Sequence, residues 1–109
     1  MNYELQSAYD EAENKWDVTV SGEIDIYNSE AFKGELYKLF ETHESSVFID
    51  CENLKYIDST GLGTLVSVLK RVKQFEGSVH LSKLKPNVKK VFKITDLNKV
   101  FEIEGDVNE

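Results

Sequence analysis

Apolar residues recur with two different periods along this chain, and the two periods alternate from one end to the other. In residues 3–9 and 16–20, every second residue falls on the same face, which is the period of a half-buried strand. Residues 28–40, 59–76 and 86–92 instead carry apolar side chains at helical spacing. Strands that alternate with helices are joined by right-handed crossovers, and the helices then cover at least one face of the sheet. The pattern therefore predicts the α/β class.

The expected sheet is mixed but mainly parallel, has about five strands and opens with an N-terminal hairpin formed by residues 3–9 and 16–20. Val47-Phe48-Ile49 is a short, unbroken apolar run. Such a run is typical of a strand covered on both faces, and it is expected to be the central strand, ending near residue 50. Val79–Leu81 and Val100–Ile103 are expected to complete the sheet.

Helix boundaries are indicated by single residues. Asn28 is placed to cap the first helix, and Pro86 suits the first turn of the third. Gly77 is expected to end the second helix in a left-handed conformation.

Length and charge limit the classes of function. With 109 residues, the chain is expected to form one domain over residues 1–109, with a frayed tail at 105–109. Twenty acidic against 13 basic residues give a formal charge of −7, which argues against nucleic acid and anionic membranes as partners. A lone cysteine favours the cytoplasm, and no run approaches the ~20 apolar residues that cross a bilayer, so no direct membrane insertion is expected.

One segment carries the chemistry, namely Ile57-Asp58-Ser59-Thr60-Gly61-Leu62-Gly63. It places Ser59 at the N-terminus of the second helix, where free backbone N–H groups and a partial positive charge tolerate a phosphate. The glycines allow close approach to the backbone. The competing interpretation is that Asp58 or Ser59 only caps the helix and the glycines serve packing.

This segment resembles the signature of the STAS-domain anti-sigma factor antagonists, bacterial proteins in which Asp-Ser-Ser/Thr-Gly lies between apolar residues. Gly22-Glu23-Ile24-Asp25 is similar to the family's Gly-Glu-Leu-Asp turn after the second strand, and residues 85–92 are similar to its third helix. Asp96 stands where the family commonly has glycine. The resemblance covers nearly the whole chain, and the matching segments follow one another in the same order as in the family.

The resemblance implies a partner-switching function without catalysis. An ATP-binding anti-sigma factor serine/threonine kinase would phosphorylate Ser59, and only the unmodified form would bind that kinase and release a sigma factor. A serine phosphatase would restore the hydroxyl. The expected partner surface around Ser59 comprises Gly22, Glu23, Asp25, Asp58, Thr60, Gly61, Leu62 and Gly63.

Several alternatives stay open. A scaffold STAS domain, assembled with its own copies or with a membrane transport complex, would use Ser59 only as a cap, whereas the switch is expected to be a monomer. Asp50, expected at the end of a central strand, is a candidate receiver-like phosphoacceptor, but the rest of that pattern is missing. Cys51 is expected to be a buried structural thiol, because its acidic neighbours disfavour a nucleophile.

No catalytic, cofactor-binding or metal-binding residues are expected, since His43 and His80 stand alone. Lysines cluster around the third helix in a patch that either faces solvent or contacts an acidic partner. These lysines are Lys83, Lys85, Lys89, Lys90 and Lys93.

Overall fold

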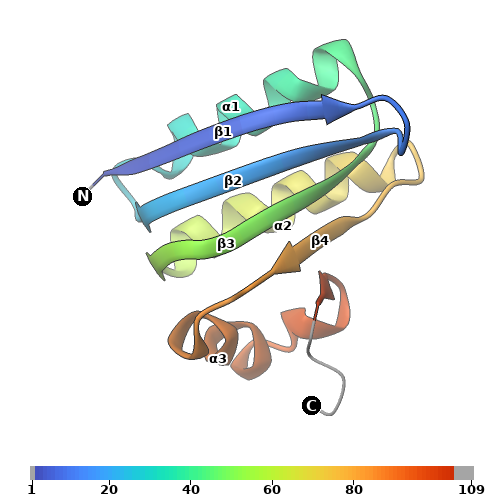
Figure 1. Ribbon diagram of the computed structural model, residues 1–109. Helices are drawn as coiled ribbons and strands as arrows, with labels where there is room; N and C mark the ends of the chain where they lie inside the picture. Colours follow the sequence, from blue (N-terminus) through green and yellow to red (C-terminus); the bar gives the residue numbers. More distant parts are fainter. Residues whose placement is uncertain (1, 105–109) are drawn as a thin grey trace.

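The computed structural model describes residues 2–104, and the tail expected to fray lies outside this range. Within it, helices and strands alternate as the sequence periods predict (Figure 1). The elements are β1 (Tyr3–Asp10), β2 (Lys15–Ile24), α1 (Ser29–Thr42), β3 (Ser46–Ile57), α2 (Ser59–Lys73), β4 (Val79–Ser82), α3 (Pro86–Ile94), a 3₁₀ turn (Leu97–Lys99) and β5 (Glu102–Ile103). No helix of the described residues is long and apolar enough to cross a membrane.

The five strands form one sheet in the order β1-β2-β3-β4-β5. The first two strands are antiparallel, and every later pair is parallel. This arrangement confirms the predicted α/β class, with a mixed, mainly parallel sheet opened by an N-terminal hairpin.

Both long helices pack on the same face of the sheet. Figure 1 shows α1 and α2 behind the strands, while α3 lies beyond the β4 side. Their apolar stripes meet the inward side chains of β2, β3 and β4. The core comprises Val18, Val20, Ile24, Phe32, Leu36, Phe40, Val47, Ile49, Leu65, Val68, Val72, Val79, Leu81 and Phe92, among others.

β3 differs from the prediction in coverage and in length. Its first residues alternate between buried and half-buried, so the strand has one covered face, whereas the run Val47-Phe48-Ile49 suggested two. Phe48 lies on the open face, where its ring stacks on His80 at 3.9 Å between centroids and Lys15 lies over it. An aromatic residue can thus occupy an open face by packing on its cross-strand neighbours.

The predicted end of β3 near residue 50 is also wrong, because the strand continues to Ile57 beside the long β2. Two irregularities in register, at Thr19/Ser21 and Gly22/Glu23, interrupt the strict alternation of this part. Asp50 therefore lies within β3, where it pairs with Lys83 at 3.6 Å, and not at the end of a strand.

The turns after α2 and α3 and the last strand also show details that the sequence did not predict. After α2 the left-handed residue is Glu76 (φ 62°), while Gly77 is needed for close approach, since a Cβ there would lie 2.7 Å from Val72 Cγ1. Asp96 adopts φ 62°, which explains why glycine suits that position. The last strand is Glu102–Ile103, shorter than the predicted Val100–Ile103. Val100 is not part of it, because this residue caps the end of the 3₁₀ turn.

Candidate functional site

The parallel pairing of β2 with β3 brings two loops together at one edge of the sheet. Glu23 pairs with Tyr56 and Ile24 with Ile57, so the chain leaves both strands side by side. The Asp58 N–H then donates to the Ile24 carbonyl over 3.1 Å. The turn after β2 and the start of α2, which are 32 residues apart in sequence, therefore form one surface.

Asp58 joins these two loops with its carboxylate. Oδ1 accepts from the Gly61 N–H at 2.9 Å and so caps α2, while Oδ2 accepts from the Ile26 N–H at 3.1 Å. A carboxylate at this position also interacts favourably with the positive end of the helix dipole. The cap predicted at Asp58 or Ser59 is thus Asp58, and it fixes the β2–α1 turn relative to Ser59.

Ser59 is the first residue of α2 and is exposed. Its hydroxyl forms no hydrogen bond with any residue in 2–104, and the neighbouring Thr60 is exposed as well. The first N–H groups of a helix have no acceptor within the helix. An exposed hydroxyl thus stands beside unpaired donors and next to the carboxylate of Asp58.

The β2–α1 turn is held by its own polar side chains. Asp25 is 5% exposed, and its Oδ1 accepts from the N–H groups of Tyr27 at 2.8 Å and Asn28 at 3.1 Å. Asn28 occupies the N-cap position but makes no side-chain capping bond to α1. Its amide instead accepts from the Asp25 N–H and donates to the Glu23 carbonyl. Asp25 therefore shapes the turn from within.

The predicted partner residues divide into exposed and buried ones. Glu23, Asp58, Thr60 and Gly63 have accessible surface, whereas Leu62 is 4% exposed and Gly61 is buried. A Cβ on Gly61 would lie 2.7 Å from Ile24 Cγ2 and 2.8 Å from Ile57 Cγ1. Gly61 thus lets α2 approach β2 and β3, and Leu62 joins the core.

Gly22 and Glu23 lie inside β2, which continues to Ile24, and not in a turn after it. Gly22 has φ 96°, and a Cβ there would lie 2.2 Å from the Asn2 carbonyl oxygen. The Glu23 N–H donates to that same carbonyl at 2.9 Å. The absence of a side chain at Gly22 therefore lets the backbone of Asn2 pack against β2.

Three large exposed side chains beside Ser59 were not predicted. Ile26 and Tyr27, on the β2–α1 turn, are 63% and 90% exposed, and Tyr56, near the end of β3, is 43% exposed. The sequence held one signal for them, because Ile26 and Tyr27 are large and apolar within a turn that is otherwise polar. Exposed apolar side chains grouped in this way are typical of protein interaction sites.

The remaining reactive residues lie elsewhere. Cys51 is buried as predicted, and burial, assisted by the charge of Asp50, raises the pKa of its thiol to about 12. Burial also lowers the pKa of His80, with Lys15 acting in the same direction against Glu102 and Glu104. Among residues 2–104, no three His, Cys, Asp or Glu side chains are grouped so as to hold a metal ion.

Comparison with known proteins finds a family model and relatives in sequence. The STAS domain family model matches residues 8–109. The anti-sigma-B factor antagonist of Bacillus subtilis (strain 168) is 35% identical over 93 residues, which are 85% of this chain and 84% of that protein. Its counterpart from Listeria monocytogenes (strain EGD-e) is 35% identical over 96 residues, covering 84% and 83%.

Solved structures share the fold. The unphosphorylated form of the anti-sigma factor antagonist SpoIIAA superposes with a TM-score of 0.71 at 17% identity, over 97% of this chain and 90% of that one. The phosphorylated form of SpoIIAA, a Bacillus cell fate determinant, gives a TM-score of 0.70 at 18% identity, over 94% and 93%.

Proposed function

The chain belongs to the STAS domain family, and on that premise we propose that it is an anti-sigma factor antagonist controlled by reversible phosphorylation of Ser59. The single observation that carries this proposal is the exposed Ser59 hydroxyl, which the fold leaves without a hydrogen bond among residues 2–104. A group that only served as a cap would be used by the helix, and here Asp58 performs that task.

In the proposed cycle, the unmodified chain binds an ATP-binding anti-sigma factor serine/threonine kinase and thereby releases a sigma factor. That kinase transfers a phosphoryl group to Ser59, which ends the binding, and a serine phosphatase restores the hydroxyl. Two relatives named anti-sigma-B factor antagonists support this assignment, as does a protein of the same fold solved in unphosphorylated and phosphorylated forms.

The surface around Ser59 explains how one phosphate would end the binding. Phosphorylation adds about −1.5 to −2 charges at pH 7, and a phosphate in an interface must be paired or desolvated. Here it would stand beside the Asp58 carboxylate, on a surface that also exposes Ile26, Tyr27 and Tyr56, so a partner docked on these apolar side chains would have to desolvate or pair it. A thousandfold loss of affinity corresponds to only about 4 kcal/mol.

The same surface explains why the modified form would keep its fold. Ser59 is exposed and stands at a helix N-terminus, where backbone N–H groups and the helix dipole favour an anion. Since Asp58 already caps the helix, the phosphate would displace no existing bond of the serine side chain. The switch would thus act on the partner's access and not on the domain's folding.

The protein would act in the cytoplasm as a monomer, with protein partners and without nucleic acid, cofactor or catalytic role of its own. Its formal charge of −7 supports the exclusion of nucleic acid, because phosphate backbones would be repelled.

Kinase assays with mass spectrometry test the site directly. The purified chain is incubated with ATP and anti-sigma factor serine kinases from its own organism, and the modified residue is then mapped. We expect one phosphate on Ser59, none on the Ser59→Ala variant, and unchanged modification of Thr60→Ala, which is the matched control in the next exposed position. Phosphate on Thr60 or on a distant residue would refute the site assignment.

A further inference from the structure

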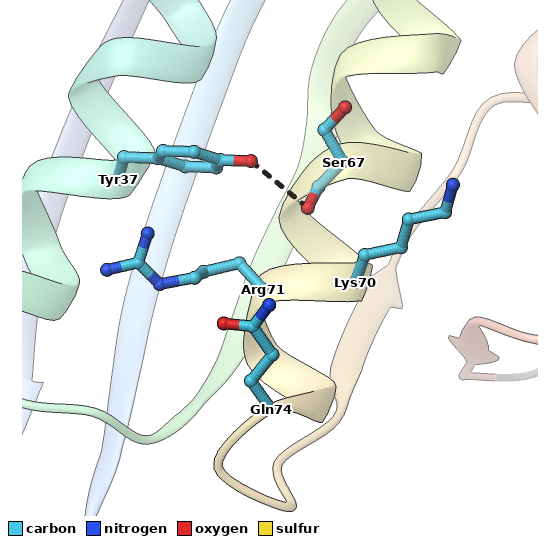
Figure 2. Close-up of a pocket in the computed structure, with 5 residues that line it drawn as sticks. All are labelled: Tyr37, Ser67, Lys70, Arg71 and Gln74. Atoms are coloured by element: carbon cyan, nitrogen blue, oxygen red, sulfur yellow. Dashed lines mark hydrogen bonds between the residues drawn. The ribbon is translucent and has the colours of Figure 1, made fainter.

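A separate hollow lies between α1 and α2, in the half of α2 that is remote from Ser59. It has a volume of about 230 Å³ and is lined by Tyr37 from α1 and by Ser67, Lys70, Arg71 and Gln74 from α2 (Figure 2). Arg71 follows Ser59 by twelve residues, so the two positions are about 18 Å apart along the helix axis. The hollow is therefore distinct from the phosphorylation surface.

Tyr37 forms a fixed wall of this hollow. Its hydroxyl donates to the Ser67 carbonyl over 3.2 Å, as the dashed line in Figure 2 shows. The Arg71 guanidinium carbon lies 5.4 Å from the centre of the tyrosine ring, within the range of a cation–π contact. The ring thus orients the guanidinium while its N–H groups remain available for other acceptors.

The hollow also carries positive charge that the fold does not neutralise. Lys33, on the same tyrosine ring at 5.9 Å, pairs with Glu30 at 3.6 Å. Among residues 2–104, neither Lys70 nor Arg71 is in an ion pair, and α2 contains no acidic residue from Ser59 to Lys73. On a chain with a formal charge of −7, this is a local reversal of sign.

We propose that this hollow docks an acidic segment of a protein partner, as a second contact surface independent of Ser59. A carboxylate would bind the Arg71 guanidinium through two parallel hydrogen bonds, and the Gln74 amide would donate a third. The Lys70 side chain points away from the ring in Figure 2, and its flexible stem lets it turn toward a bound anion.

The shape of the hollow favours a segment over a free anion. Its α2 wall runs from Ser67 to Gln74, about 10 Å along the helix axis, which is the length of about three extended residues. The two cations are adjacent residues of α2 whose side chains point in different directions in Figure 2, so they do not enclose a single point. A chain of acidic residues can contact the whole length, whereas one small anion can contact only a part.

Titration followed by NMR tests this proposal with a defined probe. A capped peptide with three consecutive Glu and Asp residues is added to the full chain at low salt, and its Gln and Asn counterpart and inorganic phosphate are added separately. We expect the acidic peptide to shift the signals of residues 67–74 and Tyr37. The amide counterpart should shift none of them, and phosphate should bind at least about tenfold more weakly.

Matched variants give the decisive comparison. Lys70→Gln combined with Arg71→Gln should raise the Kd of the peptide by about tenfold or more, while Lys85→Gln combined with Lys90→Gln removes the same charge elsewhere and should leave it unchanged. Arg71→Lys keeps the positive charge in the last turn of α2. It should still weaken binding, because lysine cannot form the two parallel hydrogen bonds to a carboxylate. Equal binding of phosphate, equal effects of the two double variants, or shifts centred on α3 would each overturn the proposal.

Discussion

Single atoms decide the geometry around Ser59. The carboxylate of Asp58 holds both the start of α2 and the Ile26 backbone, and the missing Cβ of Gly61 allows the helix to lie against β2 and β3. The sequence predicted a helix cap and a close approach at these positions, because both follow from residue type. It did not predict that one aspartate would join two loops, since that depends on the register of β2 with β3.

The two glycines at the start of α2 should respond in opposite ways to alanine. Gly61→Ala places a methyl group within 3 Å of two isoleucine side chains, so we expect a loss of about 1–3 kcal/mol in the free energy of unfolding. Gly63→Ala meets nothing within 4 Å and should gain up to about 1 kcal/mol from helix propensity. Urea denaturation measures both. A Gly61→Ala variant at least as stable as the parent would contradict the packing role of Gly61.

Asp58→Ala should destabilise the protein by about 1–2 kcal/mol, because it removes the helix cap and the bond to the Ile26 N–H together. Thr60→Ala, in the same turn but exposed, should stay within about 0.5 kcal/mol of the parent. Thermal and urea unfolding of both variants provide the comparison. If Asp58→Ala proves as stable as Thr60→Ala, the carboxylate does not hold the two loops.

At the scale of elements, periodicity predicted which segments are strands and helices better than it predicted where they end. β3 was expected to end near residue 50, yet it follows β2 to Ile57, because pairing with a long neighbour outweighs an irregular apolar pattern. Coverage of its second face could not be predicted from an apolar run alone. Phe48 and His80 show why, since they stack on each other across two strands of the open face.

His80 on β4 should make the free energy of unfolding depend on pH. Burial lowers its pKa in the folded state, so the unfolded chain, with a histidine pKa of about 6.5, binds a proton more readily. Its contribution to stability is therefore complete above about pH 6.5 and decreases as the pH falls below that value toward the folded pKa. Urea denaturation from pH 5 to 7.5 should show a steeper decline for the parent than for His80→Gln. Parallel profiles would contradict this role of His80.

In the whole molecule, the β2–α1 turn, the end of β3 and the start of α2 meet at one edge of the sheet, and together they expose Ile26, Tyr27, Tyr56 and Ser59. The α/β class, the opening hairpin and the position of Ser59 at a helix start were predictable, because they depend on local period and residue type. The exposure of Ile26, Tyr27 and Tyr56 was not, since it depends on how the strands and the turn are arranged in space.

The domain should keep its structure when Ser59 is phosphorylated. If Ser59 acts through its partner's access, phosphorylation should shift amide NMR signals mainly in residues 23–28 and 56–64 and leave those of β1, β4 and α3 in place. The reason is that the serine side chain takes no part in the core or in the described hydrogen bonds. Shifts spread across the sheet would indicate a conformational mechanism instead.

Calorimetric titration with the proposed anti-sigma factor kinase measures whether phosphorylation of Ser59 controls binding. Its binding to the unmodified protein is compared with binding to Ser59→Ala, to Ser59→Asp and to protein phosphorylated at Ser59. We predict that Ser59→Ala binds like the unmodified protein, and that the phosphorylated form and Ser59→Asp bind about a thousandfold more weakly or not at all. Equal affinity of the phosphorylated and unmodified proteins would contradict the account.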